Sequence, residues 1–148
     1  MMDDQALLRY SRQIMLPEVD FEGQERLQSA HAVIIGAGGL GSPAALYLAA
    51  AGVGRITIAD ADHAQASMCS LNPHCQVVAL DQHVEGESLE RLVASADVVL
   101  DCTDRFSSRY AVNAASQKAG VPLVSGAAIR FSGQLAVFDP RNAECPCY

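Results

Sequence analysis

A cluster of glycines is the first candidate for chemistry. Gly36, Gly38 and Gly41 form the pattern G-x-G-x-x-G, and Gly39 adds a fourth glycine inside it. The pattern follows an apolar β-branched run and precedes an alanine-rich run, so it predicts a tight turn whose bare backbone meets phosphate at a helix amino terminus. Asp60 comes about 20 residues later, where its carboxylate accepts hydrogen bonds from ribose hydroxyls. This context favours a nucleotide site over glycines needed only for helix packing.

Two arginines lie near the start of the chain, in the stretch QALLRYSRQI (residues 5–14). The spacing of its apolar residues predicts a short amphipathic helix outside the main sheet, followed by a second short helix over residues 24–29. An arginine brought to a nucleotide suits a triphosphate, because the guanidinium group forms paired hydrogen bonds with phosphate oxygens. Spacing alone favours the other interpretation, in which Arg9 and Arg12 lie on a solvated helix face.

The rest of the sequence alternates between strand-like and helix-like segments. The strand-like runs are residues 31–36, 55–60, 75–80, 97–104, 121–126 and 133–140, and the helix-like runs are residues 42–52, 88–96 and 105–120. The alternation predicts an α/β fold, a doubly wound, mostly parallel Rossmann-like sheet (residues 31–148) with an N-terminal helical extension (residues 1–30). Ligands of such sheets bind outside the carboxyl ends of the strands, which places the loops after Gly36, Asp60 and Cys102 around one crevice.

Length and charge narrow the function classes. The chain has 148 residues, half of them hydrophobic, which fits one globular domain. Its net charge of −7 disfavours binding to nucleic acid or to an anionic membrane surface. No apolar run approaches the roughly 20 residues that span a bilayer, and the first residues lack the apolar core of a secretory signal. We therefore expect a cytoplasmic protein.

Several motifs occur together and in order: R-Y-x-R-Q near the start, G-x-G-G-L-G, D-x-D, D-C-T-D and S-G-A-A-I-R. In this combination the chain resembles the MoeB/ThiF/HesA family, which is similar to the adenylation domains of ubiquitin-activating enzymes. The stretch SGAAIRFSGQ is closest to the molybdopterin-synthase adenylyltransferase branch, and the ThiF branch of thiamine biosynthesis is near. The resemblance implies a homodimer that uses magnesium ATP to adenylate the C-terminal glycine of a ubiquitin-like sulfur-carrier protein, the small subunit of molybdopterin synthase, in molybdenum cofactor biosynthesis.

The resemblance also implies roles for individual residues. Gly39 would lie against the nucleotide and Asp60 would hold the ribose. Asp104 would bind magnesium near the phosphates, with Arg105 beside it. Arg12 would reach the phosphates bound to the neighbouring subunit, so Arg12 and Asp104 are the implied catalytic residues. Carboxylates for a metal and arginines for phosphate oxygens suit nucleotidyl transfer, which depends on positioning and charge neutralisation.

The complete ATP-binding set that the resemblance implies is Gly36, Gly38, Gly39, Gly41, Asp60, Asp104 and Arg105. Two further interpretations concern the acids of D-C-T-D. Asp101 is expected to be a structural acid at the end of a strand. Asp104 is also a candidate N-cap of the following helix, a role that is compatible with metal binding.

The chain departs from the family after His63. Family members continue there with a segment resembling L-S-N-L-x-R-Q and, further on, a lysine that contacts the phosphates, whereas this chain runs directly into AQASMCSLNPHC. The stretch from Asp62 to Cys75 is also short for a crossover between parallel strands, which usually takes a dozen or more residues. Two explanations are open, a real deletion or a loop left out of the printed sequence, and we favour the second.

Five cysteines at irregular spacing indicate reduced thiols rather than a disulfide framework. Cys69, Cys75 and Cys102 are expected to be small fillers of the core. Family members continue for about another hundred residues, which is the length of a small domain, and that part carries the sulfur-transfer cysteine and completes a zinc site of two C-x-x-C pairs. Cys147 matches the first position of the first pair, so the chain holds at most one identifiable zinc ligand.

Two functions from other classes stay open at this point. An NAD-dependent oxidoreductase domain explains the glycines and Asp60 but leaves Arg12 and Asp104 without a role. An inactive module that only binds the carrier protein explains the missing segment. Magnesium-dependent binding of ATP, compared with binding of NADH, distinguishes an adenylyltransferase from the oxidoreductase. Pyrophosphate exchange distinguishes it from the inactive module.

Overall fold

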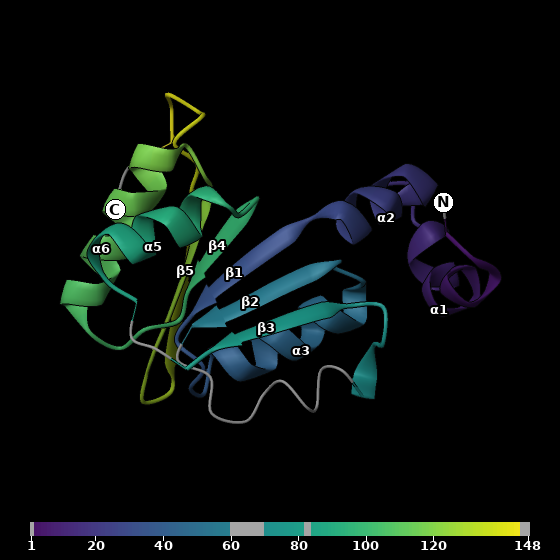
Figure 1. Cartoon of the computed structure of the whole chain (residues 1–148), viewed down its shortest axis with the longest axis horizontal. Coiled ribbons are helices and arrows are strands. Elements are labelled where there is room, and N and C mark those ends of the chain that lie inside the picture. The colour runs from purple at the N-terminus through teal and green to yellow at the C-terminus, as the bar shows by residue number, and fades with distance from the viewer. Residues whose placement is uncertain (1, 60–69, 82–83, 146–148) are drawn as a thin grey trace.

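A mixed six-stranded sheet forms the centre of the molecule. The computed structural model describes residues 2–59, 70–81 and 84–145. Its strands are β1 (His31–Ile35), β2 (Arg55–Ala59), β3 (Gln76–Leu80), β4 (Val98–Asp101), β5 (Leu123–Ile129) and β6 (Ser132–Phe138). They lie in the order β3-β2-β1-β4-β5-β6 (Figure 1). Among these described strands, only β6 runs antiparallel to its neighbour, β5. The doubly wound, mostly parallel sheet expected from the sequence is therefore confirmed.

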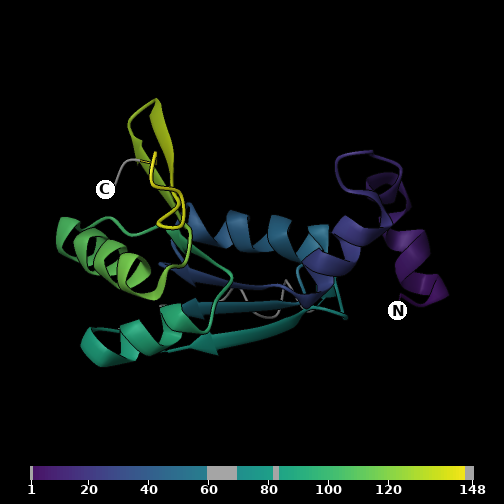
Figure 2. The same cartoon turned by 90° about the horizontal axis from the view of Figure 1, so that it is seen from above.

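Helices cover both faces of this sheet. They are α1 (Asp4–Ile14), α2 (Asp20–Ser29), α3 (Gly41–Ala51), α5 (Gly86–Ala94) and α6 (Phe106–Ala119). Figure 2 shows α3 and α5 on opposite sides of the strands. The hydrophobic core is correspondingly divided, with one cluster against α3 and another against α5 and α6.

The central strand β1 contributes to both halves of the core. Val33 and Ile35 belong to the cluster of α5 and α6, whereas Ala32 and Ile34 belong to the cluster of α3. Successive side chains of a strand point to opposite faces, so a strand covered on both sides must be apolar throughout. This requirement explains the continuous apolar run and fixes where the following glycine loop leaves the sheet.

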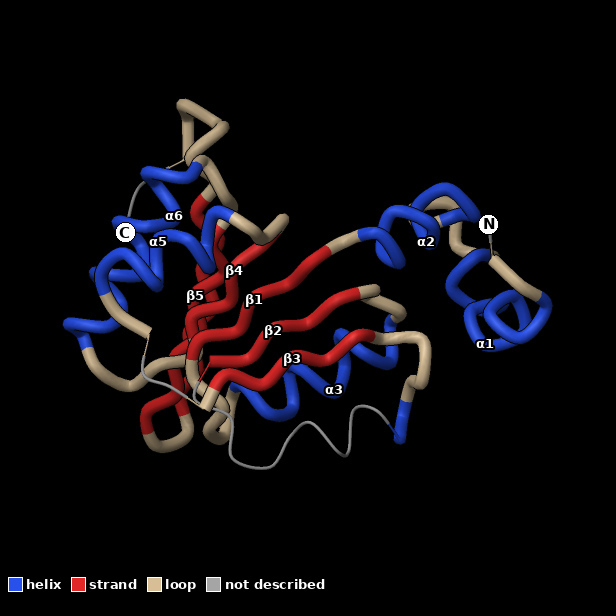
Figure 3. The backbone as a smooth tube through the Cα atoms, in the orientation of Figure 1, coloured by secondary structure: helices blue, strands red, loops and turns tan. Residues whose placement is uncertain are grey.

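The N-terminal helices pack at the amino ends of β2 and β3. The buried hydroxyl of Tyr10 accepts a hydrogen bond of 2.8 Å from Nδ2 of Asn72, which precedes β3. Gly52 precedes β2 with φ +93, and a Cβ there would lie 2.7 Å from the Tyr10 ring. Nε2 of the buried Gln24 donates to the carbonyl oxygen of Ala51 at 3.0 Å. Figure 3 shows both helices beyond this end of the strands.

The second helix begins earlier than the sequence pattern predicts. The expected start was residue 24, whereas α2 begins at Asp20. The amide of Gly23 donates to the carbonyl oxygen of Val19 at 2.8 Å, so the glycine lies inside the helix rather than before it.

Within the described ranges, none of the helices has the length and apolar character needed to cross a membrane.

Candidate functional site

Two glycines of the loop between β1 and α3 are required by packing. Gly36 has φ +94, a conformation that glycine adopts without steric cost, and a Cβ there would lie 2.9 Å from the carbonyl oxygen of Cys102. A Cβ on Gly41 would lie 1.8 Å from the carbonyl oxygen of Gly36. The loop therefore folds tightly on itself and against the end of β4. Helix packing explains these two glycines without any ligand.

The other two glycines face open space. Gly38 and Gly39 are exposed, and a Cβ on either would have no atom of residues 2–59, 70–81 or 84–145 within 4 Å. Neither has positive φ. The next residue, Leu40, is the N-cap of α3 and makes no side-chain capping hydrogen bond, and the first turn of the helix carries no acidic residue. The backbone here can approach an anion, which the dipole of α3 attracts. Two residues of the first turn offer no free amide to it, because Pro43 has no N–H group and the amide of Ser42 donates to the carbonyl oxygen of Gly38 at 3.1 Å.

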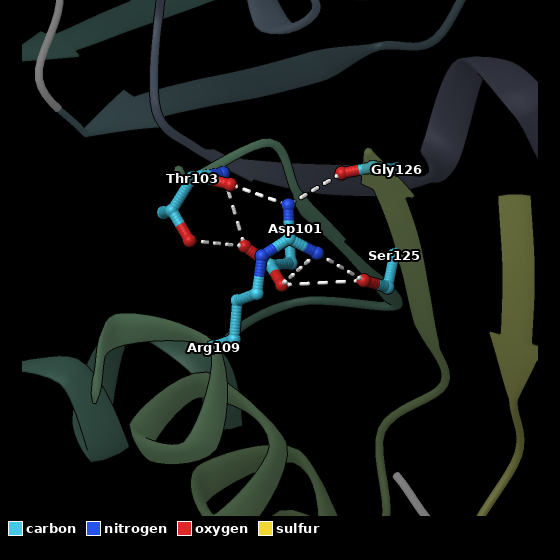
Figure 4. Close-up of polar contacts among 5 residues, drawn as sticks. All are labelled: Asp101, Thr103, Arg109, Ser125 and Gly126. Carbon is cyan, nitrogen blue, oxygen red and sulfur yellow. Dashed lines mark hydrogen bonds and ion pairs between the residues drawn. The ribbon is translucent and has the colours of Figure 1, made fainter. Parts of the chain in front are cut away.

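The loop after β4 is fixed by a buried carboxylate. Asp101, the last residue of β4, is 0% exposed. Its Oδ1 accepts hydrogen bonds from the amide of Thr103 at 3.0 Å and from Thr103 Oγ1 at 2.7 Å. Its Oδ2 accepts from Ser125 Oγ at 3.3 Å, which connects β4 to β5 (Figure 4). The expectation that Asp101 is a structural acid agrees with this geometry.

Arg109 is the cation that accompanies Asp101 in the core. It lies on α6 with 8% exposure, and its Nη1 is 3.6 Å from Asp101 Oδ2. Nη1 donates to Ser125 Oγ at 3.0 Å, and Nη2 donates to the carbonyl oxygens of Thr103 at 2.5 Å and Gly126 at 2.8 Å (Figure 4). A buried charge needs such partners because its removal from water is unfavourable. The guanidinium group thus joins α6, the loop after β4 and strand β5.

Asp104 and Arg105 follow this anchored segment and are exposed. Asp104 has no hydrogen bond or ion pair in the described part of the chain. The N-cap of α6 is Arg105, whose backbone is extended (φ −101, ψ 129) and whose side chain makes no capping hydrogen bond. The N-cap interpretation of Asp104 is therefore wrong, because the helix begins one residue later than that role requires. Its carboxylate is left available to a ligand.

The structure does not bring Arg12 to these loops. Arg12 is exposed on α1, at the amino ends of the strands, whereas the glycine loop and Asp104 lie at the carboxyl ends (Figure 1). A five-residue strand spans about 17 Å. The other arginine of this helix, Arg9, donates to the carbonyl oxygen of Leu71 at 3.0 Å. Within its own chain Arg12 therefore lies on a solvated helix face, as the spacing indicated. Arg9 is also exposed, but its side chain donates a hydrogen bond to the chain.

Two residues of the expected site lie outside the described ranges. These are Asp60, expected at the ribose, and Cys147, expected to bind zinc. The described residues contain no group of three or more His, Cys, Asp or Glu side chains that could hold a metal ion. The roles of both residues stay predictions.

The cysteine beside the site is not activated. Burial, to which the Asp101 carboxylate adds, raises the pKa of the Cys102 thiol to about 11. A thiol with that pKa is protonated at neutral pH and is a poor nucleophile. Cys102 and the buried Cys75 both pack in the α3 half of the core, as expected for fillers.

Sequence reasoning missed Arg109. One signal was present, because Arg109, Val112 and Ser116 share the buried side of α6. An arginine at helical spacing on an otherwise apolar or small-residue face indicates a buried cation, and Asp101 at the end of the preceding strand offers a partner. The pairing itself depends on how α6 packs on the sheet.

Comparison with known proteins shows what the chain is similar to. The model of the ThiF family matches residues 10–67 and 61–148. The chain is 42% identical over 163 residues to the sulfur carrier protein ThiS adenylyltransferase of Escherichia coli K12, covering 94% of this chain and 65% of that protein. It is 40% identical over 171 residues to the molybdopterin-synthase adenylyltransferase of Salmonella typhimurium LT2, covering 99% and 68%. The chain thus spans about two thirds of the length of these relatives.

The solved structures agree on the fold. The tRNA N6-threonylcarbamoyladenosine dehydratase of E. coli, solved in complex with ATP, superposes with a TM-score of 0.78 at 23% identity, covering 88% of this chain and 65% of that one. The alignment to the Salmonella protein runs over 171 positions, more than the 148 residues of this chain. That relative therefore has residues within the aligned region that have no counterpart here.

Proposed function

Because the chain belongs to the ThiF family, we propose that it adenylates the C-terminal carboxylate of a ubiquitin-like sulfur-carrier protein with magnesium ATP. In this reaction a carboxylate oxygen of the carrier forms a bond to the α-phosphorus of ATP, and the bond to the bridging oxygen of the leaving pyrophosphate breaks. The products are an acyl-adenylate and pyrophosphate. The carrying observation is that two exposed glycines and a carboxylate without a partner among the described residues lie in loops that touch each other at the same edge of the sheet.

The glycine loop supports ATP as the ligand. Gly38 and Gly39 leave their outer side open, so the backbone can approach phosphates without a clash. The dipole at the amino end of α3 also favours an anion. Asp60 would bind the ribose, and Arg105 would lie beside the phosphates. An NAD-dependent oxidoreductase would use the same loop, but it gives the exposed Asp104 no role.

Asp104 fits a magnesium ligand. An exposed carboxylate with no partner in the described residues can move to meet a cation. Magnesium is commonly held by one or two carboxylates together with substrate phosphates. When bound, the ion would neutralise charge on the phosphate oxygens. Asp101 cannot take this role, because its carboxylate is fully buried and occupied by Thr103 and Ser125.

Arg12 supports a homodimer in which each subunit completes the other's site. The polar residues of R-Y-x-R-Q differ in whether their side chains make hydrogen bonds within the described chain. Arg9 holds the carbonyl of Leu71, Tyr10 is bonded to Asn72, and Gln13 donates to Ala51 and Gln24. Arg12 makes no such contact in the described residues. An arginine that the described part of its own fold does not use, and that lies at the far end of its own sheet, suits a role in a neighbouring subunit.

The hairpin of β5 and β6 is the surface we assign to the carrier. Ser125 is the last residue of β5 that pairs with β4, whereas pairing with β6 continues to Ile129. The hairpin therefore extends beyond the carboxyl ends of the sheet, and it exposes Ile129, Phe131 and Leu135 by 74%, 109% and 75%. A carrier must bring its C-terminus to the nucleotide, so its body must contact this edge. Exposed apolar groups there suit a protein partner.

The carrier itself belongs to one of two pathways. We propose the small subunit of molybdopterin synthase, because the S-G-A-A-I-R-F-S-G-Q stretch resembles that branch and the chain is 40% identical to a molybdopterin-synthase adenylyltransferase. The second candidate is the carrier of thiamine biosynthesis, favoured by the 42% identity to a ThiS adenylyltransferase. We also propose a cytoplasmic location, a segment missing after His63, and a zinc site that Cys147 would begin in a longer protein.

Pyrophosphate exchange tests this function. Full-length protein, ATP, Mg²⁺ and each of the two carriers should incorporate labelled pyrophosphate into ATP, with one carrier at least about tenfold better than the other. Asp104→Asn should abolish most exchange with an unchanged fold. Glu87→Gln, which changes another exposed acid, on α5 and 3.8 Å from Arg91 Nη1, is the control and should leave exchange intact. No exchange with either carrier, together with tighter binding of NADH than of ATP, would refute the proposal.

A further inference from the structure

The buried pair of Asp101 and Arg109 holds the backbone of one residue, Thr103, from both sides. The amide and hydroxyl of Thr103 both donate to Asp101 Oδ1, at 3.0 and 2.7 Å. The carbonyl oxygen of Thr103 accepts from Nη2 of Arg109 at 2.5 Å. Both backbone polar groups of this residue are therefore fixed by the pair, although Thr103 belongs to neither a helix nor a strand.

The residue held in this way adjoins both parts of the proposed ATP site. Asp104 follows it directly in the chain. On the other side, a Cβ on Gly36 would lie 3.0 Å from the carbonyl carbon of Cys102 and 3.3 Å from the amide nitrogen of Thr103. The glycine loop therefore rests on the segment that Arg109 and Asp101 fix. Movement of Thr103 would displace the carboxylate and the glycine loop together.

The three acceptors of Arg109 require its particular shape. They are the carbonyl oxygens of Thr103 and Gly126 and the hydroxyl of Ser125. Pairing of β5 with β4 ends at Ser125, so the Gly126 carbonyl lies beyond that ladder. A planar guanidinium group presents several donors in fixed directions, whereas an ammonium group is a single point charge. Lysine would preserve the charge beside Asp101 but would not hold all three oxygens.

We propose that Arg109 is a positioning residue for nucleotide activation: through Thr103 it sets the place of the Asp104 carboxylate and of the glycine loop before ATP and magnesium bind. The proposal rests on the proposed function for the identity of the ligand. It does not follow from stability alone, because well-packed apolar residues often replace a buried ion pair with no loss of stability.

The test compares two substitutions in the same cluster of full-length protein. Arg109→Lys keeps the charge and loosens Thr103. Ser125→Ala, the matched control, removes a partner of both Arg109 and Asp101 but leaves every contact to Thr103 in place. Amide exchange of residues 102–105 without ligand is the first readout. The second is the Mg²⁺ concentration at half-saturation of ATP binding, followed by calorimetry.

Arg109→Lys should speed exchange in this segment and raise the half-saturating Mg²⁺ concentration, each by roughly tenfold, whereas Ser125→Ala should change neither by more than about twofold. Equal effects of the two variants, or normal values in Arg109→Lys, would overturn the positioning role. If Arg109→Lys does not fold, Asp101→Asn combined with Arg109→Gln leaves no unpaired buried charge and should give the same shifts. Failure of the wild type to bind ATP would instead refute the proposed function, and the exchange measurement would still decide whether Arg109 holds the segment.

Discussion

Gly39→Ala separates a glycine that serves a ligand from one that serves the fold. The backbone of Gly39 has no positive φ, and the new Cβ would have no atom of the described residues within 4 Å. The folded protein therefore accommodates alanine without strain. Alanine also restricts the unfolded chain, so the free energy of unfolding should rise by about 0.4–1 kcal/mol.

In the proposed site, the same methyl group would occupy space that ATP needs. Where a backbone must approach phosphate closely, an added methyl group acts like overpacking, which costs about 1–3 kcal/mol. At about 1.4 kcal/mol per tenfold, the Kd for ATP should rise roughly 5- to 150-fold. Thermal unfolding and calorimetric titration with magnesium ATP measure the two effects on one sample. Stability and affinity should change in opposite directions.

Two further glycine substitutions complete the comparison. Gly23→Ala, inside α2 and remote from the glycine loop, should stabilise the protein by about 0.5–1 kcal/mol and leave the Kd unchanged. Gly41→Ala places a Cβ 1.8 Å from the Gly36 carbonyl oxygen and should destabilise the fold itself. An unchanged Kd in Gly39→Ala, with ATP bound normally by the wild type, would show that the nucleotide does not approach this backbone.

Three other predictions concern assembly, the carrier and Cys102. Arg12→Ala and Asp104→Ala proteins, each nearly inactive, should regain about a quarter of wild-type pyrophosphate exchange when their subunits are exchanged, since half of the dimers are mixed and each has one complete site; mixed dimers without activity would exclude Arg12 from the partner's site. Phe131→Ser should weaken carrier binding about tenfold in a pull-down titration while ATP binding is unchanged, and equal weakening of both would indicate misfolding instead. Alkylation of Cys102, followed by peptide mass spectrometry, should be at least about tenfold slower at pH 8 than that of an unperturbed thiol and should rise as pH approaches about 11. The unfolded thiol ionises at lower pH than the folded one, so the contribution of Cys102 to the free energy of unfolding should fall as the pH rises from about 9 to about 11. An alkylation rate that follows an ordinary thiol pKa would contradict the raised pKa.

The fold class and the family follow from the sequence because their signals are local. Apolar runs, a glycine pattern and the alternation of strands with helices are each contained in a few consecutive residues. The buried run from His31 to Ile35 shows the reason, since a strand covered on both faces leaves its mark in its own five residues. The N-terminal helices were also predicted, although α2 begins four residues before the expected start.

The tertiary structure decided which residues of each motif are buried in packing contacts and which are exposed. The glycine pattern does not reveal that Gly36 and Gly41 serve packing while Gly38 and Gly39 face open space, because that depends on a contact with residue 102 in a distant part of the chain. The two acids of D-C-T-D likewise cannot be distinguished from the sequence motif alone. Burial of Asp101 and exposure of Asp104 follow from where β4 ends within the sheet.

Long-range geometry also settled the two arginines that matter most to the proposals. Arg109 meets Ser125 and Gly126 only because α6 folds back onto β5, and no local pattern encodes that approach. Arg12 lies at the amino ends of the strands only because Tyr10 packs against Gly52 and Asn72. The sequence by itself determined which residue types were available and the order of the elements. Burial, pairing and distance from the site arise when segments far apart in the chain pack together, and only the tertiary structure decides those.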